Sequence, residues 1–232
     1  MSTPRYALYY APAADSPLWH FGCATLGYDA FTGEDIAFAA PAGCNADRWP
    51  QLTAEPRRYG FHATLKAPFE LAHGRSEGQL RAFAHQIAAG LSAVPLAGLA
   101  IAALGRFIAL TPAGPSPALQ TLAFDIVQAF EPFRAPLGAA DLARRLASPL
   151  TPAQRAYLEA YGYPYVGDDF RFHMTLTGSL PQDDVAGTTA ALGQAYAAAV
   201  PAAPAVIDRL ALFRQDSREG RFRLLDSFML GR

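Results

Sequence analysis

Two short segments of the chain share one alternating pattern of apolar and polar residues. Residues 61–66 (FHATLK) and residues 172–177 (FHMTLT) both begin Phe-His-x-Thr-Leu. In an extended strand, side chains alternate between the two faces, so every second residue shares a face. The polar face then holds His62, Thr64 and Lys66 in the first segment and His173, Thr175 and Thr177 in the second. The opposite, apolar face can pack on a core, which predicts two half-buried strands that each present a histidine beside a threonine.

Helical spacing predicts the elements that follow each of these strands. Apolar residues recur every three or four positions in residues 76–94 and again in a segment that begins at Ser116-Pro117, as on one face of an amphipathic helix. Further helices are expected after Ser16-Pro17, over 151–161 and over 183–200, because Ser, Thr and Pro favour helix starts. Strands are expected at residues 5–11, 99–104, 107–110, 170–180, 206–213 and 221–230, and residues 31–55 are interpreted as mostly loop.

The order of elements after each motif is the same: strand, helix, hairpin. The hairpin turns also match, as Gly105-Arg106-Phe107 and Gly220-Arg221-Phe222, after similar intervals. We infer an internal duplication, and a period this long favours two similar lobes related by an approximate two-fold axis. The predicted architecture is an α+β fold in which residues 1–232 form a single bilobal domain, with lobes of about 1–112 and 113–232. His62 and His173 would face each other across one central cleft.

The composition indicates a globular protein with a small ligand. Of the 232 residues, 51% are hydrophobic and 17% are charged, and the formal net charge is −1, which excludes a disordered chain and an overall basic field. We therefore expect no duplex nucleic acid and no membrane as partners. The two cysteines, Cys23 and Cys44, have neither the spacing of a zinc site nor the density of a disulfide scaffold. With no signal peptide recognisable in residues 1–10, we expect a cytoplasmic protein, and a monomer.

Two histidines on facing strands suit the hydrolysis of a cyclic phosphodiester. One neutral imidazole can deprotonate water while one protonated imidazole protonates the leaving alkoxide, because imidazole titrates near pH ~6.5. Thr64 and Thr175 could donate hydrogen bonds to the phosphoryl oxygens. A lone His-x-Thr would be weak evidence, but its repetition in matching contexts favours a catalytic pair.

Other residues are candidates for binding the substrate. Lys66, the only lysine, and Arg171 could add positive charge beside the first and second histidine, and Thr177 occupies the position that matches Lys66. Tyr59, with Tyr163 and Tyr165, could line the cleft, although packing at strand edges explains these aromatic residues equally well. We expect no metal site and no cofactor, since no carboxylate or cysteine recurs beside both histidines and threonine is a poor zinc ligand.

The paired His-x-Thr motifs resemble those of the 2H phosphoesterase superfamily, which includes RNA ligase-like cyclic phosphodiesterases. The longer strings RYGFHATLKAPF (58–69) and FRFHMTLTGSL (170–180), with LFRQ (212–215), resemble a bacterial branch encoded with phosphonate-utilisation genes. The resemblance covers essentially the whole chain. It implies two antiparallel sheets flanked by helices, metal-independent hydrolysis, and catalytic roles for His62, Thr64, His173 and Thr175.

Three functions remain open at this point. The first is a phosphodiesterase that opens a small ribose or nucleoside cyclic phosphate, linked by the resemblance to phosphonate metabolism. The second is an enzyme that processes RNA 2′,3′-cyclic ends or oligonucleotide tails, which would show a strong salt dependence. The third is a non-catalytic nucleotide-binding module, against which the two intact motifs argue. Neither the substrate nor the assignment of acid and base to the two histidines follows from the sequence.

Overall fold

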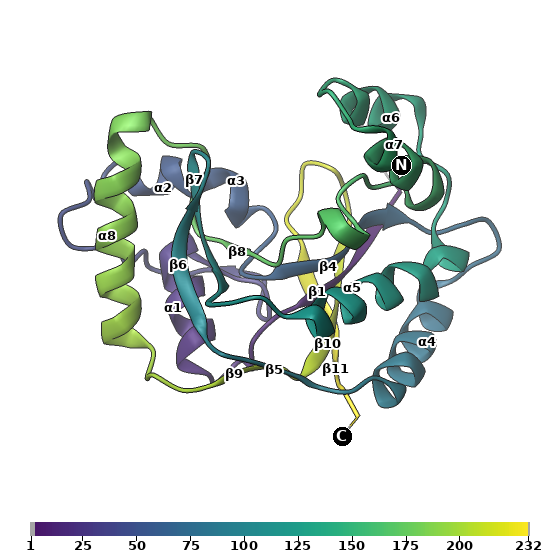
Figure 1. Cartoon of the computed structure of the whole chain (residues 1–232), viewed down its shortest axis with the longest axis horizontal. Coiled ribbons are helices and arrows are strands. Elements are labelled where there is room, and N and C mark those ends of the chain that lie inside the picture. The colour runs from purple at the N-terminus through teal and green to yellow at the C-terminus, as the bar shows by residue number, and fades with distance from the viewer. Residues whose placement is uncertain (1–2, 232) are drawn as a thin grey trace.

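The computed structural model describes residues 3–231, and its centre is one twisted antiparallel sheet of seven strands (Figure 1). The strand order across the sheet is β11-β10-β1-β4-β8-β7-β6. The strands are β1 (Arg5–Tyr10), β4 (Ala63–Glu70), β6 (Leu99–Leu104), β7 (Phe107–Pro112), β8 (Met174–Thr175), β10 (Arg209–Gln215) and β11 (Arg223–Met229). Two small sheets pair β2 (Tyr28–Asp29) with β3 (Glu34–Asp35) and β5 (Val94–Leu96) with β9 (Ala205–Ile207).

Helices lie over both ends of the sheet. In Figure 1, α8 (Gln182–Ala199) stands along β6 at the left, and α4 (Glu77–Gly90) and α5 (Pro117–Ala129) lie at the right. The remaining helices are α1 (Pro17–Leu26), α2 (Trp49–Leu52), α3 (Ala54–Arg57), α6 (Ala139–Leu146) and α7 (Pro152–Tyr161), with 3₁₀ turns η1 (Glu131–Phe133) and η2 (Gly167–Asp169). None of the helices within residues 3–231 has the length and apolar character needed to cross a bilayer.

The predicted helix starts are confirmed, and side chains explain them. Ser16 and Ser116 each accept a hydrogen bond from a backbone N–H of the first turn, and each is followed by proline. Ser76 and Thr151 form complete capping boxes with the glutamine three residues later. These contacts satisfy N–H groups that have no partner within the helix, so helix starts are determined locally.

The expected antiparallel α+β class is confirmed, but the two expected sheets are joined into one. The strands of the two motifs, β4 and β8, pair antiparallel through a single residue pair, Ala63 and Met174. Four strands lie on the β4 side of this junction and three on the β8 side. Both residues of the junction are fully buried, which fixes them on the core face.

The hairpin that follows each motif joins the side of the sheet that contains the motif strand of the other half. The β6–β7 hairpin follows β4 in the sequence but pairs with β8, and the β10–β11 hairpin follows β8 but pairs with β1. The helices cross in the same way, since α4 packs on β10 and β11 whereas α8 packs on β6 and β7. The two sides of the sheet therefore each contain strands from both halves of the chain.

The second motif strand is much shorter than the 170–180 expected from the sequence. Strand β8 contains only residues 174–175, because the chain leaves the ladder directly afterwards. The N–H groups of Leu176 and Thr177 both donate to the Ile108 carbonyl, and the Ile108 N–H donates to the Thr177 hydroxyl. Residues 31–55, interpreted as mostly loop, contain β3 and α2 and the start of α3, and helix α6 was not expected at all.

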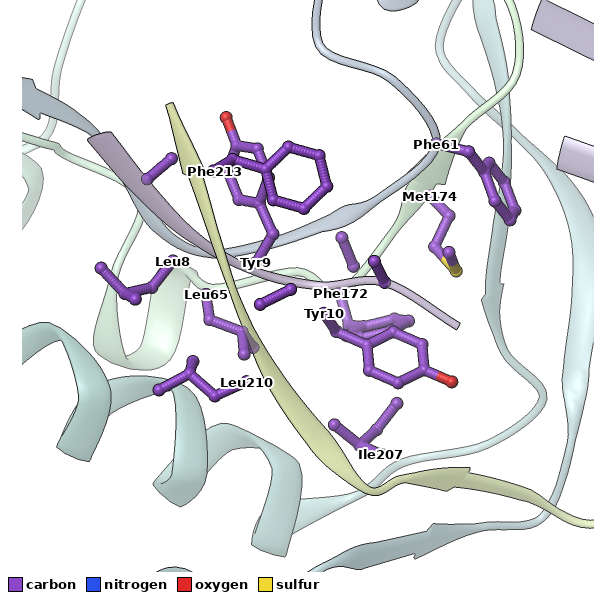
Figure 2. Packing of buried hydrophobic residues seen from close by; sticks show 14 of the residues in the cluster. Leu8, Tyr9, Tyr10, Phe61, Leu65, Phe172, Met174, Ile207, Leu210 and Phe213 are labelled. Carbon is purple, nitrogen blue, oxygen red and sulfur yellow. The ribbon is translucent and has the colours of Figure 1, made fainter. Parts of the chain in front are cut away.

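The hydrophobic core includes buried side chains on both faces of the sheet. Figure 2 shows Leu8, Leu65 and Leu210 pointing toward these helices, while Tyr9 and Phe213 point to the opposite face. Phe61, Phe172 and Met174 are buried near the β4–β8 junction. The apolar residues of both motifs thus face the core, as the alternating pattern predicts.

Candidate active site

The β4–β8 junction brings the two His-x-Thr motifs together in a crossed arrangement. Because Ala63 lies opposite Met174 in an antiparallel pair, the same register places His62 beside Thr175 and Thr64 beside His173. Neighbours directly across such strands have Cβ atoms about 4.5–5.5 Å apart and share a face. The four polar side chains therefore form one cluster, with each histidine next to the threonine of the other motif.

Two cavities open on this cluster, and each is lined by the histidine of one motif and the threonine of the other. One, of about 240 Å³, is lined by His62 and Thr175 together with Tyr59 and Glu55. The other, of about 160 Å³, is lined by Thr64 and His173. Each cavity thus contains an imidazole from one half of the chain and a hydroxyl from the other.

Both imidazoles are oriented by a backbone carbonyl two residues earlier. His62 Nδ1 lies 2.9 Å from the Gly60 oxygen, and His173 Nδ1 lies 2.7 Å from the Arg171 oxygen. A carbonyl only accepts, so Nδ1 carries the hydrogen in both rings and the neutral imidazole presents Nε2 as the acceptor. In His62, Nε2 faces the cluster and lies 3.2 Å from the Thr64 hydroxyl oxygen.

The backbone at residue 60 requires glycine. Gly60 has φ +75°, and a Cβ at this position would lie 2.7 Å from the Ala30 Cβ. The left-handed conformation is open to glycine at little cost. It turns the Gly60 carbonyl toward the imidazole of His62.

The environment of His62 favours its neutral form. The pKa of His62 is lowered to about 4, mainly by burial; the hydrogen bond to Gly60 opposes this shift and the nearby charge of His173 adds to it. The ring stacks on the fully buried Tyr9 at a centroid distance of 3.8 Å and an interplanar angle of 26°. At neutral pH this imidazole can accept a proton.

The alternating pattern predicts that Lys66 shares a face with His62 and Thr64. The structure places Lys66 on the opposite face. Strand β4 contains extra residues relative to β1, so that Tyr9 lies opposite Thr64 while its neighbour Leu8 already lies opposite Lys66. This bulge moves Lys66 to the face covered by α5. Its ammonium group is buried and donates to the Val127 carbonyl (2.8 Å) and to Glu131 (2.7 Å).

The other predicted binding residues also line the cavities, but they differ in whether their polar groups already form hydrogen bonds within the protein. Tyr59 lines the His62 cavity and stacks on Phe222. Arg171 lines the His173 cavity, but one of its nitrogens donates to the carbonyls of Asp168 and Phe170. Thr177 is fully buried, and its hydroxyl accepts the Ile108 N–H, as described above.

Tyr163 and Tyr165 both line the His173 cavity, with their rings 5.5 Å apart.

Sequence reasoning missed Tyr9, which lies in a continuous run of apolar and aromatic residues where no alternation marks the site face. Within residues 3–231, no group of three or more histidine, cysteine or acidic side chains is arranged to hold a metal ion.

Comparison with known proteins gives a family and several distant structural relatives. Residues 64–223 match the family model described as "Protein of unknown function (DUF1045)". The chain is 39% identical over 218 residues to a protein of Janthinobacterium sp. (strain Marseille) named ribose 1,5-bisphosphate phosphokinase PhnN, covering 93% of this chain and 48% of the relative. A Laribacter hongkongensis protein of the same name is 34% identical, covering 95% of this chain and 50% of the relative. The chain therefore spans about half the length of the curated relatives it matches.

Solved structures similar to this chain include Escherichia coli LigT bound to 3′-AMP, at 15% identity and a TM-score of 0.44, covering 99% of both chains. A structure described as a phosphoesterase gives 16% identity and a TM-score of 0.43, again covering 99% of both chains. Likeness at this level does not transfer an activity.

Proposed function

The chain belongs to the DUF1045 family, to which no function is assigned, and we propose that it is a metal-independent phosphodiesterase that opens a small cyclic phosphodiester. The observation that carries the proposal is the crossed pair of His-x-Thr motifs. Two imidazoles, each held at Nδ1 by a backbone carbonyl so that Nε2 is left for the reaction, and each beside a hydroxyl from the other half, match the needs of acid and base catalysis at one phosphorus atom.

The two histidines take different roles in the proposed reaction. His62, whose pKa is lowered to about 4, is neutral and accepts a proton from the attacking water. His173 is then the general acid, which donates a proton to the oxygen that leaves phosphorus. Water thus adds to phosphorus as one P–O bond of the ring breaks, and the product is a phosphomonoester with a free hydroxyl group beside it.

The threonines would stabilise the charge that develops on the non-bridging oxygens. Thr64 and Thr175 are at most partly exposed and lie on the site face of the junction. A hydroxyl that donates to a phosphoryl oxygen contributes most when the charge on that oxygen increases in the transition state.

The names of the curated relatives favour a phosphorylated ribose as substrate. Those proteins are named for ribose 1,5-bisphosphate, and hydrolysis of ribose 1,2-cyclic phosphate 5-phosphate at the bond to O2 would give that compound. This chain has one lysine, Lys66, preceded by leucine, so it has no P-loop motif Gly-x-x-x-x-Gly-Lys-Ser/Thr to support the phosphokinase reaction itself. The link to phosphonate metabolism is part of this proposal.

Product analysis by phosphorus NMR with EDTA present tests the proposal. Purified protein is incubated with ribose 1,2-cyclic phosphate 5-phosphate and, separately, with an oligoribonucleotide that ends in a 2′,3′-cyclic phosphate. We expect opening of the sugar cyclic phosphate at a rate that EDTA does not change. Opening of the RNA end alone would assign the chain to RNA processing, and tight binding of both without turnover would support a binding module.

Replacement of either histidine provides the matched test of mechanism. His62→Ala and His173→Ala should each lower kcat by at least about 100-fold, as for loss of a general base or acid. His73→Ala, at an exposed loop position, serves as the control and should leave kcat unchanged. Full activity in either motif variant would contradict the two-histidine mechanism.

A further inference from the structure

A third cavity, of about 80 Å³, adjoins the His173 cavity and contains an arginine that the proposed reaction does not use. Tyr163, Val166 and Ala67 line both cavities. Arg5 lies in the wall of the third cavity, on the same strand as Tyr9 and four residues before it. Since side chains alternate along a strand, Arg5 and Tyr9 share the face on which His62 lies.

Arg5 is held in place by neutral groups. Its Nε donates to the Gln215 side-chain oxygen at 2.8 Å, its Nη2 donates to the same oxygen, and its guanidinium lies 5.6 Å from the centre of the Phe222 ring. Among the residues that the structure describes, no carboxylate forms an ion pair with Arg5. Burial and the charge of Arg218 lower its pKa from the usual value, as expected for a cation without a matching anion.

The hydroxyl of Tyr9 is a second group without a partner. Tyr9 is fully buried, and in the described part of the chain its hydroxyl makes no hydrogen bond. The hydroxyl points away from the helices α4 and α5 (Figure 2). Burial raises the pKa of Tyr9 well above its usual value, and the ionisable side chains near enough to affect that pKa, Arg5, Tyr59 and Tyr163, all line the cavities of the site. Leaving a buried hydroxyl without a partner is unfavourable, and a ligand that accepts its hydrogen bond would remove that cost.

The other charged residues of this cavity are already paired. Arg218 donates to both Glu70 (3.0 Å) and Asp141 (2.6 Å and 2.9 Å). Lys66 and Arg134 also border the cavity, but both bind Glu131. Arg5 is therefore the group in this wall whose charge is left for a ligand.

The wall of the third cavity combines elements that are distant in the sequence. Residues 135–138 and Asp141 of α6 line it together with Arg5.

We propose that Arg5 and the Tyr9 hydroxyl form a second anion subsite, which binds a terminal phosphate on the same sugar whose cyclic phosphate lies between His62 and His173. This assignment rests on the proposed function and specifies its substrate as a cyclic phosphodiester that carries a second phosphate. A guanidinium binds phosphate through charge-assisted hydrogen bonds, and a hydroxyl adds one donor.

The test compares kcat/KM for ribose 1,2-cyclic phosphate with and without a 5-phosphate. The preference of the wild-type protein for the phosphorylated sugar should fall about 10- to 100-fold in Arg5→Gln and several-fold in Tyr9→Phe. Tyr9→Phe keeps the ring on His62 and removes a hydroxyl without a partner, so its unfolding temperature should not decrease. Arg81→Gln, which removes an exposed arginine paired with Asp226 on the surface, is the control and should keep the preference.

Three outcomes would overturn the subsite. They are an equal loss on both sugars in Arg5→Gln, an unchanged preference in that variant, and a larger effect on an oligoribonucleotide 2′,3′-cyclic end than on the phosphorylated sugar. If the wild type opens neither sugar, the proposed function fails, and calorimetry with ribose 5-phosphate then decides the subsite alone. Binding to wild type that weakens at least about tenfold in Arg5→Gln would support the subsite, and equal binding would refute it.

Discussion

At the scale of single residues, the imidazole of His62 combines two features that a general base needs. Its Nδ1 is held by the Gly60 carbonyl, so the proton acceptor is Nε2, and its burial against Tyr9 favours the neutral ring. A base must be unprotonated when water arrives, and a lowered pKa ensures this throughout the neutral range.

The pH dependence of kcat/KM should therefore show an acidic limb near pH 4. The pKa of His62 is lowered to about 4 in the folded protein, so the base is neutral above that pH and becomes protonated as the pH falls through it. Initial rates from pH 3.5 to 8, with circular dichroism at each pH to confirm that the protein stays folded, would measure the limb. A midpoint near the ordinary value of pH ~6.5 would mean that His62 is not the base.

Sequence reasoning predicted that the four motif residues lie together because their alternation is local, but it did not point to Tyr9 or Arg5. Both lie on β1, which ends at Tyr10, whereas its neighbour β4 begins only at Ala63. The two strands are therefore far apart in the sequence. Which residue of β1 faces His62 depends on the pairing of two strands, which no local pattern contains.

At the scale of elements, strand β4 shows how a bulge changes the function expected of a residue. In a regular strand Lys66 would share the face of Thr64, whereas the extra residues in β4 place it under α5 with Glu131. Pro68 lies in the same strand, and proline in a sheet is found at edges and bulges because it donates no ladder hydrogen bond. That proline was the one local sign that the alternation is interrupted.

Lys66→Met should lower stability rather than affinity for the substrate. Removing one partner of a buried ion pair costs about 3–5 kcal/mol, and the lower end applies here because Glu131 keeps Arg134 as a partner. Urea unfolding should show a loss of about 3 kcal/mol, with KM unchanged under conditions where the variant is folded. The matched surface variant Arg81→Met should lose less than about 1 kcal/mol. Unchanged stability together with a large increase in KM would restore the substrate-binding role.

The helices were predicted well and the second motif strand poorly, for one physical reason. Helix starts depend on side chains within one turn, such as Ser76 with Gln79. The length of β8 depends instead on the hydrogen bonds that Leu176 and Thr177 make to Ile108, a residue of the other half. Contacts between distant segments leave no periodic signal in the sequence.

At the scale of the whole molecule, the fold depends on the exchange of hairpins between the two halves of the chain. Strand β8 lies between β4 and β7 of the first half, and the β10–β11 hairpin of the second half completes the side of the sheet that contains β4. The lobes predicted from the sequence, about 1–112 and 113–232, are therefore not separated in the sheet.

Neither half should fold alone. The fragment 1–112 would expose the face of β7 that pairs with β8 and the edge of β1 that pairs with β10, and such unpaired edges promote aggregation. Circular dichroism and proton NMR of each purified half should show unfolded or aggregated chains, and mixing the refolded halves should restore dispersed spectra and activity. A folded, monomeric 1–112 fragment would contradict this dependence.

The exchange of hairpins also has a consequence for the origin of the fold. A single half-length chain of this topology contains one histidine and one threonine of the cluster, and its own hairpin does not complete its own sheet. Two identical copies related by a two-fold axis could complete each other, because in a symmetric dimer each chain gives what it receives. If the halves arose by the duplication that the repeated motifs predict, an ancestor of half this length would have assembled the site as a homodimer with exchanged hairpins, and fusion of two copies would have let Lys66 and Thr177 diverge at the same place in the motif.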